Sequence, residues 1–190
     1  MTGLHSPCYT SVMNTNKNVL WITLTAIFIA LLVVLQAATA SLGNTLVTGS
    51  VVNFILIISV MTCGLKTGLP VAIISPVTAK FFGIGPFWAF IPFIAAGNCM
   101  LVLVWRIAGN LPIKKKIVSY VIALIAAAIA KFLVVYFGIV KVAVPLFMGL
   151  PEAQAAVVSS AFSLPQLFTA SMGGALAILI LPVLRKALGK

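Results

Sequence analysis

The sequence predicts an all-α integral membrane protein, built as a bundle of six transmembrane helices with the N- and C-termini in the cytoplasm. The first observation is composition: 63% of the 190 residues are hydrophobic and 7% are charged, whereas soluble domains are about half apolar and about a quarter charged. The second is that the apolar residues form long runs without period-2 alternation, which favours helices over a barrel. The third is the one-sided distribution of lysine and arginine.

Six apolar segments follow one another along the chain, and each is assigned one membrane span. The second and third are shorter than the ~20 residues that a helix needs to cross a bilayer, so flanking polar residues or local irregularity must complete them. No soluble domain fits between the segments, and residues 17–190 are therefore predicted to form a single six-helix membrane domain. The expected spans are 18–40, 49–64, 68–83, 86–108, 113–140 and 163–186.

The segment ahead of the first span, residues 1–16, is predicted to be a disordered N-terminal leader. Residues 1–12 are polar and follow no pattern, and Met13 offers an alternative natural start. The apolar run from Val19 to Ala40 is too long for the core of a signal peptide, and it is interpreted as a membrane span.

Basic residues determine the predicted orientation, because positively charged loops favour the cytoplasmic side. With the N-terminus inside, only Lys80, Lys131 and Lys141 lie away from that side. Two connections are then extracellular: residues 41–49, and residues 141–162, which are long enough to cover a site or to carry short helical pieces. The other nine of the twelve basic residues are cytoplasmic: Lys17, Lys66, Arg106, Lys114, Lys115, Lys116, Arg185, Lys186 and Lys190.

Lys131 lies in the middle of an apolar run, "AAAIAKFLVVYF", at residues 126–137. An ammonium group at the centre of a bilayer costs about 3 kcal/mol on insertion scales. The usual remedy is a carboxylate, but Glu152 is the only acidic residue of the chain. A rise of ~1.5 Å per residue puts Lys131 about 22 Å from the inner end of its span, in the outer half of the membrane.

Other polar side chains are expected at a similar depth on the separate spans. Because polar groups are costly in lipid, they should face the bundle interior or water, which describes a pocket open to the outside. The missing counter-charge of Lys131 is then supplied by a ligand, a small solute with a carboxylate. The candidate substrate-binding residues are Gln36, Asn53, Lys80, Asn98, Lys131, Gln166 and, as part of an aromatic wall, Tyr136.

Simpler interpretations stay open for these residues. Asn and Gln in membrane helices often only hydrogen-bond a neighbouring helix. Lys80, and to a lesser extent Lys131, can extend their ammonium groups toward the outer interface, and Glu152 can reach Lys131 from its loop. Tyr136 can anchor the membrane interface.

Several function classes are disfavoured by residues that the sequence lacks. The cysteines form no C-x-x-C pair and His5 is the single histidine, so no metal site and no cofactor are expected. There is no phosphate-binding loop and no set of catalytic side chains, so the chain is predicted not to be an enzyme. Proton coupling normally needs an intramembrane Asp, Glu or His, which the spans lack. The formal charge of +11 is confined to short segments between spans, so it indicates topology and not nucleic-acid binding.

Ala26 and Ala30 are four residues apart in the first span, "WITLTAIFIALLVVLQ". Small-xxx-small spacing allows another helix to approach closely. The partner helix can belong to another subunit or to this same bundle. "MGGALA", residues 172–177, is a second close-packing segment with the same ambiguity.

The chain resembles the S components of energy-coupling factor (ECF) vitamin transporters over about residues 17–190. The resemblance rests on size, topology, the A-x-x-x-A motif at Ala26 and Ala30, and the stretches "TGSVVNFILI" (48–57), "GIGP" (83–86) and "AAGNCMLVLVW" (95–105). It implies a substrate-capture subunit in the cell membrane that binds a vitamin from outside. It also implies docking through the alanine motif on a shared transmembrane coupling subunit, which sits on two ATPase subunits that hydrolyse ATP.

Among these proteins the chain looks most like the pantothenate-specific members, on "GNCMLVLVW" and on Gln36, Asn53, Asn98 and Lys131. Pantothenate has one carboxylate, one amide and two hydroxyls, which suit a lysine and several amides. The alternatives are a cobalamin-specific S component, one for another vitamin, a stand-alone solute carrier or channel, and a structural membrane protein without a ligand.

Overall fold

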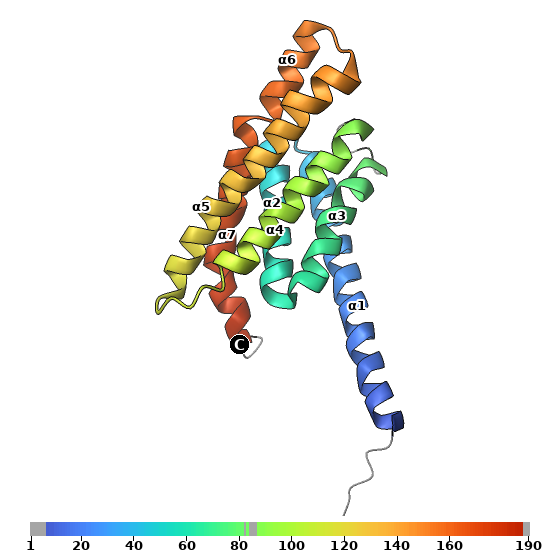
Figure 1. The fold of residues 1–190 in the computed structure, drawn as a ribbon, viewed down its shortest axis with the longest axis vertical. Helices are drawn as coiled ribbons and strands as arrows, with labels where there is room; N and C mark the ends of the chain where they lie inside the picture. The colour runs from blue at the N-terminus through green and yellow to red at the C-terminus, as the bar shows by residue number, and fades with distance from the viewer. Residues whose placement is uncertain (1–6, 82, 84–86, 188–190) are drawn as a thin grey trace, which may run out of the picture.

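A computed structural model describes residues 7–81, 83 and 87–187, and this part of the chain is all-helical, with no strand (Figure 1). The helices lie side by side in a bundle, and short connections join most of them. In chain order they are α1 (Pro7–Ala40), α2 (Thr45–Cys63), α3 (Leu65–Phe81), η1 (Trp88–Phe90), α4 (Ile91–Ala108), α5 (Lys116–Val135), η2 (Tyr136–Met148), α6 (Glu152–Ala161) and α7 (Leu164–Ala187).

Within the described residues, five helical segments are long and apolar enough to cross a membrane, as expected for a multi-pass membrane protein. The helix α3 has 17 residues and contains Pro70 and Pro76, so it is short for a full span. Its prolines remove backbone N–H donors from the helix interior. The five segments are Asn18–Ala40, Thr45–Cys63, Trp88–Ala108, Lys116–Met148 and Glu152–Ala187.

The boundaries of α2 have clear local causes. At its start the Asn44 side chain accepts hydrogen bonds from the backbone N–H groups of Leu46 and Val47, which satisfies donors that have no partner inside the helix. At its end Gly64 has a φ of 84°, a conformation that glycine adopts without steric cost. The chain then turns directly into α3.

Two segments differ from the sequence expectation. Residues 7–16 of the expected disordered leader belong to α1, while residues 1–6 lie outside the described residues. The outer connection 141–162, for which short helical pieces were expected as one possibility, is largely helical, because η2 continues α5 to Met148 and α6 follows after Gly149. In Figure 1 the tip formed by η2 and α6 extends beyond the other helices.

The helix α2 is the centre of the bundle and packs against α1, α3, α4 and α7. Its contact with α7 is close because a Cβ atom on Gly173 would lie 2.6 Å from the backbone oxygen of Ser50 and 2.7 Å from Cβ of Asn53. The main core includes Leu56, Leu101 and Trp105, all fully buried. This close packing brings the polar residues of separate helices within hydrogen-bonding range.

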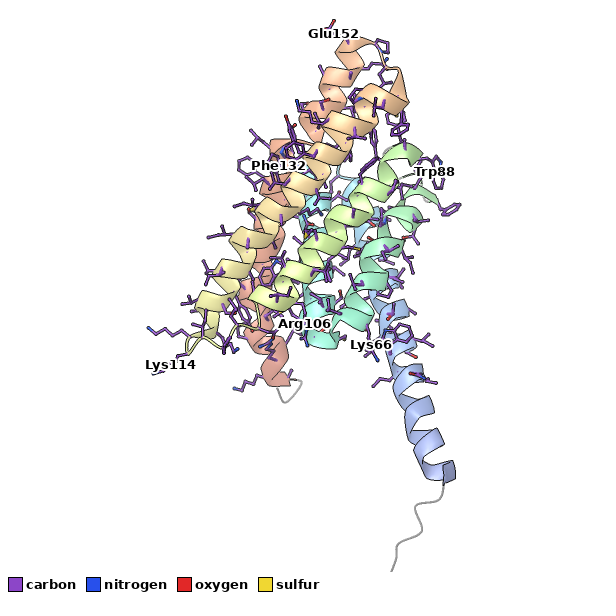
Figure 2. The ribbon with its side chains drawn as sticks, in the orientation of Figure 1. Lys66, Trp88, Arg106, Lys114, Phe132 and Glu152 are labelled. Carbon is purple, nitrogen blue, oxygen red and sulfur yellow. The ribbon has the colours of Figure 1, made fainter. Side chains whose placement is uncertain are left out.

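The two ends of the bundle differ in charge. Figure 2 shows Lys66, Arg106 and Lys114 at the end where the C-terminus lies, and Glu152 at the opposite tip. We call the first of these the basic end. The connection between α1 and α2 lies away from it, since the α2–α3 turn that carries Lys66 is at the other end of α2.

Candidate functional site

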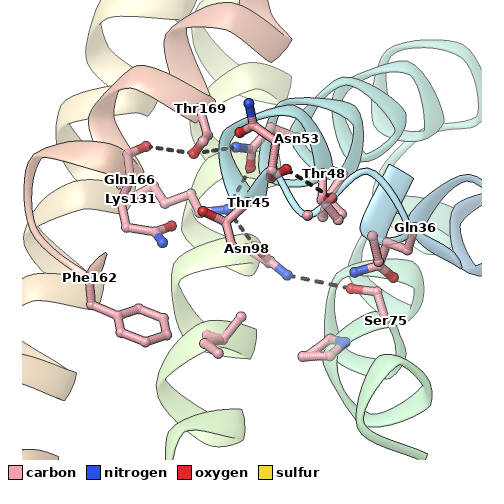
Figure 3. Close-up of a pocket in the computed structure, with 17 residues that line it drawn as sticks. Gln36, Thr45, Thr48, Asn53, Ser75, Asn98, Lys131, Phe162, Gln166 and Thr169 are labelled. Carbon is pink, nitrogen blue, oxygen red and sulfur yellow. Dashed lines mark hydrogen bonds between the residues drawn. The ribbon is translucent and has the colours of Figure 1, made fainter. Parts of the chain in front are cut away.

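A cavity of about 310 Å³ opens in the half of the bundle away from the basic end. All six long helices contribute a polar side chain to its wall, and the α1–α2 connection also lines it. Figure 3 shows Gln166 and Phe162 on one side of this cavity and Gln36 and Ser75 on the other. The polar residues that line it, in chain order, are Gln36, Asn44, Thr45, Thr48, Asn53, Ser75, Asn98, Lys131, Gln166 and Thr169.

The ammonium group of Lys131 is buried, with 4% of the residue exposed. Its Nζ donates hydrogen bonds to Oδ1 of Asn53, at 2.5 Å, and to Oδ1 of Asn98, at 2.7 Å. Both acceptors are neutral amides, and among the described residues no carboxylate pairs with Lys131, Glu152 being at the distant tip. An ammonium has three N–H donors, so these two bonds leave one donor for a further acceptor.

The two amides are oriented by bonds on their other side. Nδ2 of Asn53 donates to Oγ1 of Thr169 at 3.3 Å, and Thr169 in turn donates to the backbone oxygen of Gln166 at 3.2 Å. Nδ2 of Asn98 lies 3.4 Å from both the Ala72 backbone oxygen and Ser75 Oγ. Because each Nδ2 is held by a neighbouring helix, each Oδ1 points at the ammonium. We call Lys131, Asn53, Asn98, Thr169 and Ser75 the Lys131 network.

Gln36 lines the cavity outside this network. The residue is 9% exposed, and its Oε1 has no hydrogen-bond partner among the described residues. A buried polar atom without a partner costs about 1–3 kcal/mol. Within the described residues, Oε1 of Gln36 is therefore an acceptor without a partner at the cavity wall.

Five of the seven predicted substrate-binding residues line this cavity: Gln36, Asn53, Asn98, Lys131 and Gln166. The structure does not bring Lys80 or Tyr136 there. Lys80 is half-buried in the last turn of α3, beyond the cavity. Tyr136 stacks on Phe132 with ring centroids 5.5 Å apart, and Lys141 Nζ lies 5.7 Å from its ring centroid.

The two simpler interpretations of Lys131, extension to the membrane interface and pairing with Glu152, do not match the structure. Its ammonium points into the bundle, so it does not extend to the membrane interface, and Glu152 is not its partner. The simpler interpretation of the amides, that they only hydrogen-bond a neighbouring helix, is correct in part. Asn53 and Asn98 do bond neighbouring helices, and they bond Lys131 at the same time.

Several cavity residues were absent from the predicted set. Ser75, Thr45 and Thr48 line the wall with hydroxyl groups, and Phe162 adds an aromatic ring. Hydroxyl residues in membrane helices commonly bond their own backbone, as Ser75 does with the Ala72 oxygen at 3.4 Å, so the sequence alone gives no signal for them. Phe162 packs edge-on against Phe90, with centroids 5.4 Å apart, in a contact between distant segments.

Ala26 and Ala30 are exposed on the outer face of α1, together with Ile22 and Ile27. The structure therefore does not support the alternative in which Ala26 and Ala30 pack inside the bundle. In contrast, Gly173 and Gly174 of the "MGGALA" segment are buried, so that segment packs internally.

The cavity is lined by groups of several chemical kinds. It offers one positive charge, several amides and hydroxyls, and apolar surface from Val52, Ile94 and Phe162. Among the described residues no group of His, Cys, Asp or Glu is arranged to hold a metal ion. A small anion with polar groups along its length matches this lining. Comparisons with known protein families, with curated proteins and with solved structures find no match to this chain.

Proposed function

We propose that this protein is the substrate-capture subunit of an ATP-driven importer of the ECF type, and that it binds a small carboxylate vitamin from the extracellular side. The observation that carries the proposal is the buried ammonium of Lys131 at the wall of a cavity, held by two neutral amides. A buried charge without an opposite charge is costly. A carboxylate in the cavity would supply the counter-charge.

Pantothenate is the solute that we favour. Its carboxylate would pair with Lys131, while Gln36, Gln166 and the hydroxyls of the wall would bond its amide and hydroxyls. The volume supports a small solute, because about 310 Å³ lies at the lower end of the range for ligand pockets. Cobalamin, the principal alternative, needs a much larger cavity.

In this proposal the protein lies in the cell membrane and crosses it six times, with α3 as the short span. Both termini are then in the cytoplasm. The gathering of Lys66, Arg106 and Lys114 at one end supports this orientation through the positive-inside rule. The cavity then lies in the extracellular half. A short α3 is tolerated in this arrangement because other helices surround it.

The exposed Ala26 and Ala30 would dock on the transmembrane coupling subunit, whose two ATPases supply the energy. Exposed small residues let a partner helix come close. This chain itself has no phosphate-binding loop, so uptake against a gradient would depend on those partners.

The test is native mass spectrometry of the protein purified from cells, followed by calorimetric titration with pantothenate and with cobalamin. We expect a co-purified small carboxylate and binding of pantothenate. Binding of cobalamin alone would assign the other S-component class. Solute flux into vesicles that hold this chain alone would identify a stand-alone carrier and contradict the proposal.

A further inference from the structure

Two hollows meet at the basic end of the bundle, on the opposite side of the membrane domain from the cavity. One, of about 410 Å³, lies between α1, the α2–α3 turn and the end of α4. The other, of about 390 Å³, lies between that turn, α4 and α7. Cys63, Gly64 and Arg106 line both, so the guanidinium of Arg106 stands between the two hollows.

The charge around these hollows is wholly positive. Lys66 and Arg106 line the first and Arg185 lines the second. Arg185 is held in place, because its Nη2 donates to Oδ1 of Asn110 at 3.2 Å and its guanidinium lies 5.5 Å from the ring centroid of Tyr120. In the part of the chain that the structure describes, the side chains of Lys66 and Arg106 have no carboxylate partner.

The first hollow is also apolar along α1. Leu20 and Leu24 line it, and Trp21 fixes its wall by donating from Nε1 to the backbone oxygen of Lys66 at 2.7 Å. Leu20 is 60% exposed, so this apolar wall continues onto the outer surface of α1. An occupant must therefore combine an anionic group with a hydrocarbon part. A free phosphate ion would use only the charged side of the hollow.

We propose that this hollow binds one anionic phospholipid, with its phosphate between Arg106 and Lys66 and its acyl chains along Leu20 and Leu24. Guanidinium groups match phosphate oxygens with paired N–H donors. Basic pockets between transmembrane helices are a known setting for anionic headgroups. The bound lipid would hold α1 against the α2–α3 turn, beside the hydrogen bond from Trp21 to Lys66. The inference is independent of the solute that occupies the cavity.

The experiment is native mass spectrometry of the full chain in mild detergent, with phosphatidylglycerol or phosphatidylcholine added in equal amounts. We expect one retained phosphatidylglycerol and little phosphatidylcholine. Arg106→Gln and Lys66→Gln should each lower the retained phosphatidylglycerol about fivefold, the effect expected for one basic contact. Lys114→Gln is the matched control: it removes the same charge at the same end but from a residue outside both hollows, and it should leave retention unchanged.

Four results would overturn the proposal. Equal retention of the two lipids, or equal loss in Lys114→Gln and Arg106→Gln, would show non-specific attraction to the basic end. Displacement of the lipid by inorganic phosphate at millimolar concentration would show a simple anion site. Unchanged lipid retention in Arg106→Gln, with loss of a co-purifying protein, would assign the surface to a protein partner. An unchanged size-exclusion profile in the same detergent verifies that each variant is folded.

Discussion

At the scale of single residues, Lys131 is the exceptional group of this protein. Its ammonium is buried among helices of an apolar bundle and contacts only neutral oxygens, from Asn53 and Asn98. Two amide acceptors lessen the cost of burying the charge, but they do not neutralise it. We infer that such a site is suited to receive an anion, which would supply the opposite charge that the amides lack.

The substitution Asn98→Asp tests this account by adding a resident counter-charge. The new carboxylate would lie where the Oδ1 atom of Asn98 now lies, 2.7 Å from Nζ of Lys131. We expect the ligand-free protein to melt at a higher temperature, because the buried ammonium gains a partner. We also expect the affinity for a carboxylate solute to fall by about tenfold or more, since the two anions repel.

Thermal melting and calorimetry of the same samples measure both effects of Asn98→Asp. Asn110→Asp is the control, because it adds one negative charge beside Arg185 at the basic end, away from the cavity. That variant should leave solute affinity unchanged. Unchanged solute affinity in Asn98→Asp would contradict the assigned role of Lys131.

The sequence allowed prediction of the residue types and their depth, but not of the helix faces. Five predicted residues line the cavity because depth follows from the rise per residue. Tyr136 lies five residues after Lys131, which places it about 140° around the helix, on another face. Lys80 is four residues after Pro76, on the same face but one turn beyond the cavity.

At the scale of elements, the close approach of α2 and α7 positions the Lys131 network. A Cβ atom on Gly173 would lie 2.6 Å from the Ser50 backbone oxygen and 2.8 Å from the Phe54 backbone nitrogen. Backbone atoms cannot move aside as a side chain can. The hydrogen bond from Asn53 on α2 to Thr169 on α7 therefore depends on a glycine at position 173.

We expect Gly173→Ala to destabilise the protein by about 1–3 kcal/mol, the usual cost of overpacking, and to weaken solute binding by separating Asn53 from Thr169. Gly174→Ala is the matched control. A Cβ at Gly174 would meet side-chain atoms, of Leu124 at 3.1 Å and of Trp105 at 3.3 Å, and not the backbone of α2. The melting temperatures and calorimetric affinities of the two variants are compared. Equal effects of Gly173→Ala and Gly174→Ala would show that the α2–α7 contact does not position the Lys131 network.

The helical elements were predicted with different success. The span expected over 163–186 is α7, which begins at Leu164 and ends at Ala187. The connection expected over 141–162 proved mostly helical, because its apolar stretch extends α5 through η2 to Met148. Apolar periodicity alone does not mark where a long helix leaves the bilayer, so the continuation of α5 was not predicted, although short helical pieces in this connection were allowed for.

At the scale of the whole molecule, the outer face of α1 is the surface that we assign to partner subunits. In the span Asn18–Ala40 only 11% of the most apolar stretch is buried inside the protein. Ala26 and Ala30 lie exposed on this helix and do not line the cavity. Capture of the solute and coupling to ATP hydrolysis are thus assigned to separate surfaces.

We expect the double variant Ala26→Phe and Ala30→Phe to bind solute with unchanged affinity and to lose complex formation with a coupling subunit, because bulky rings prevent close helix approach. Co-purification of the complex and calorimetry measure the two properties. Ala37→Phe, at an exposed alanine of the same helix outside the motif, controls for added bulk. A complex that forms normally with the double variant would contradict the docking role.

The most direct test of the central claim, that Lys131 receives a carboxylate, compares pantothenate with pantothenol, in which a hydroxymethyl group replaces the carboxylate. Calorimetric titration should show that the wild-type protein prefers pantothenate by about tenfold or more, as expected for a buried charged contact. In Lys131→Met this preference should disappear, whereas Lys141→Met, at an exposed lysine further along the same helix, should keep it. Equal affinity of the wild-type protein for the two compounds, or binding of neither, would contradict the account.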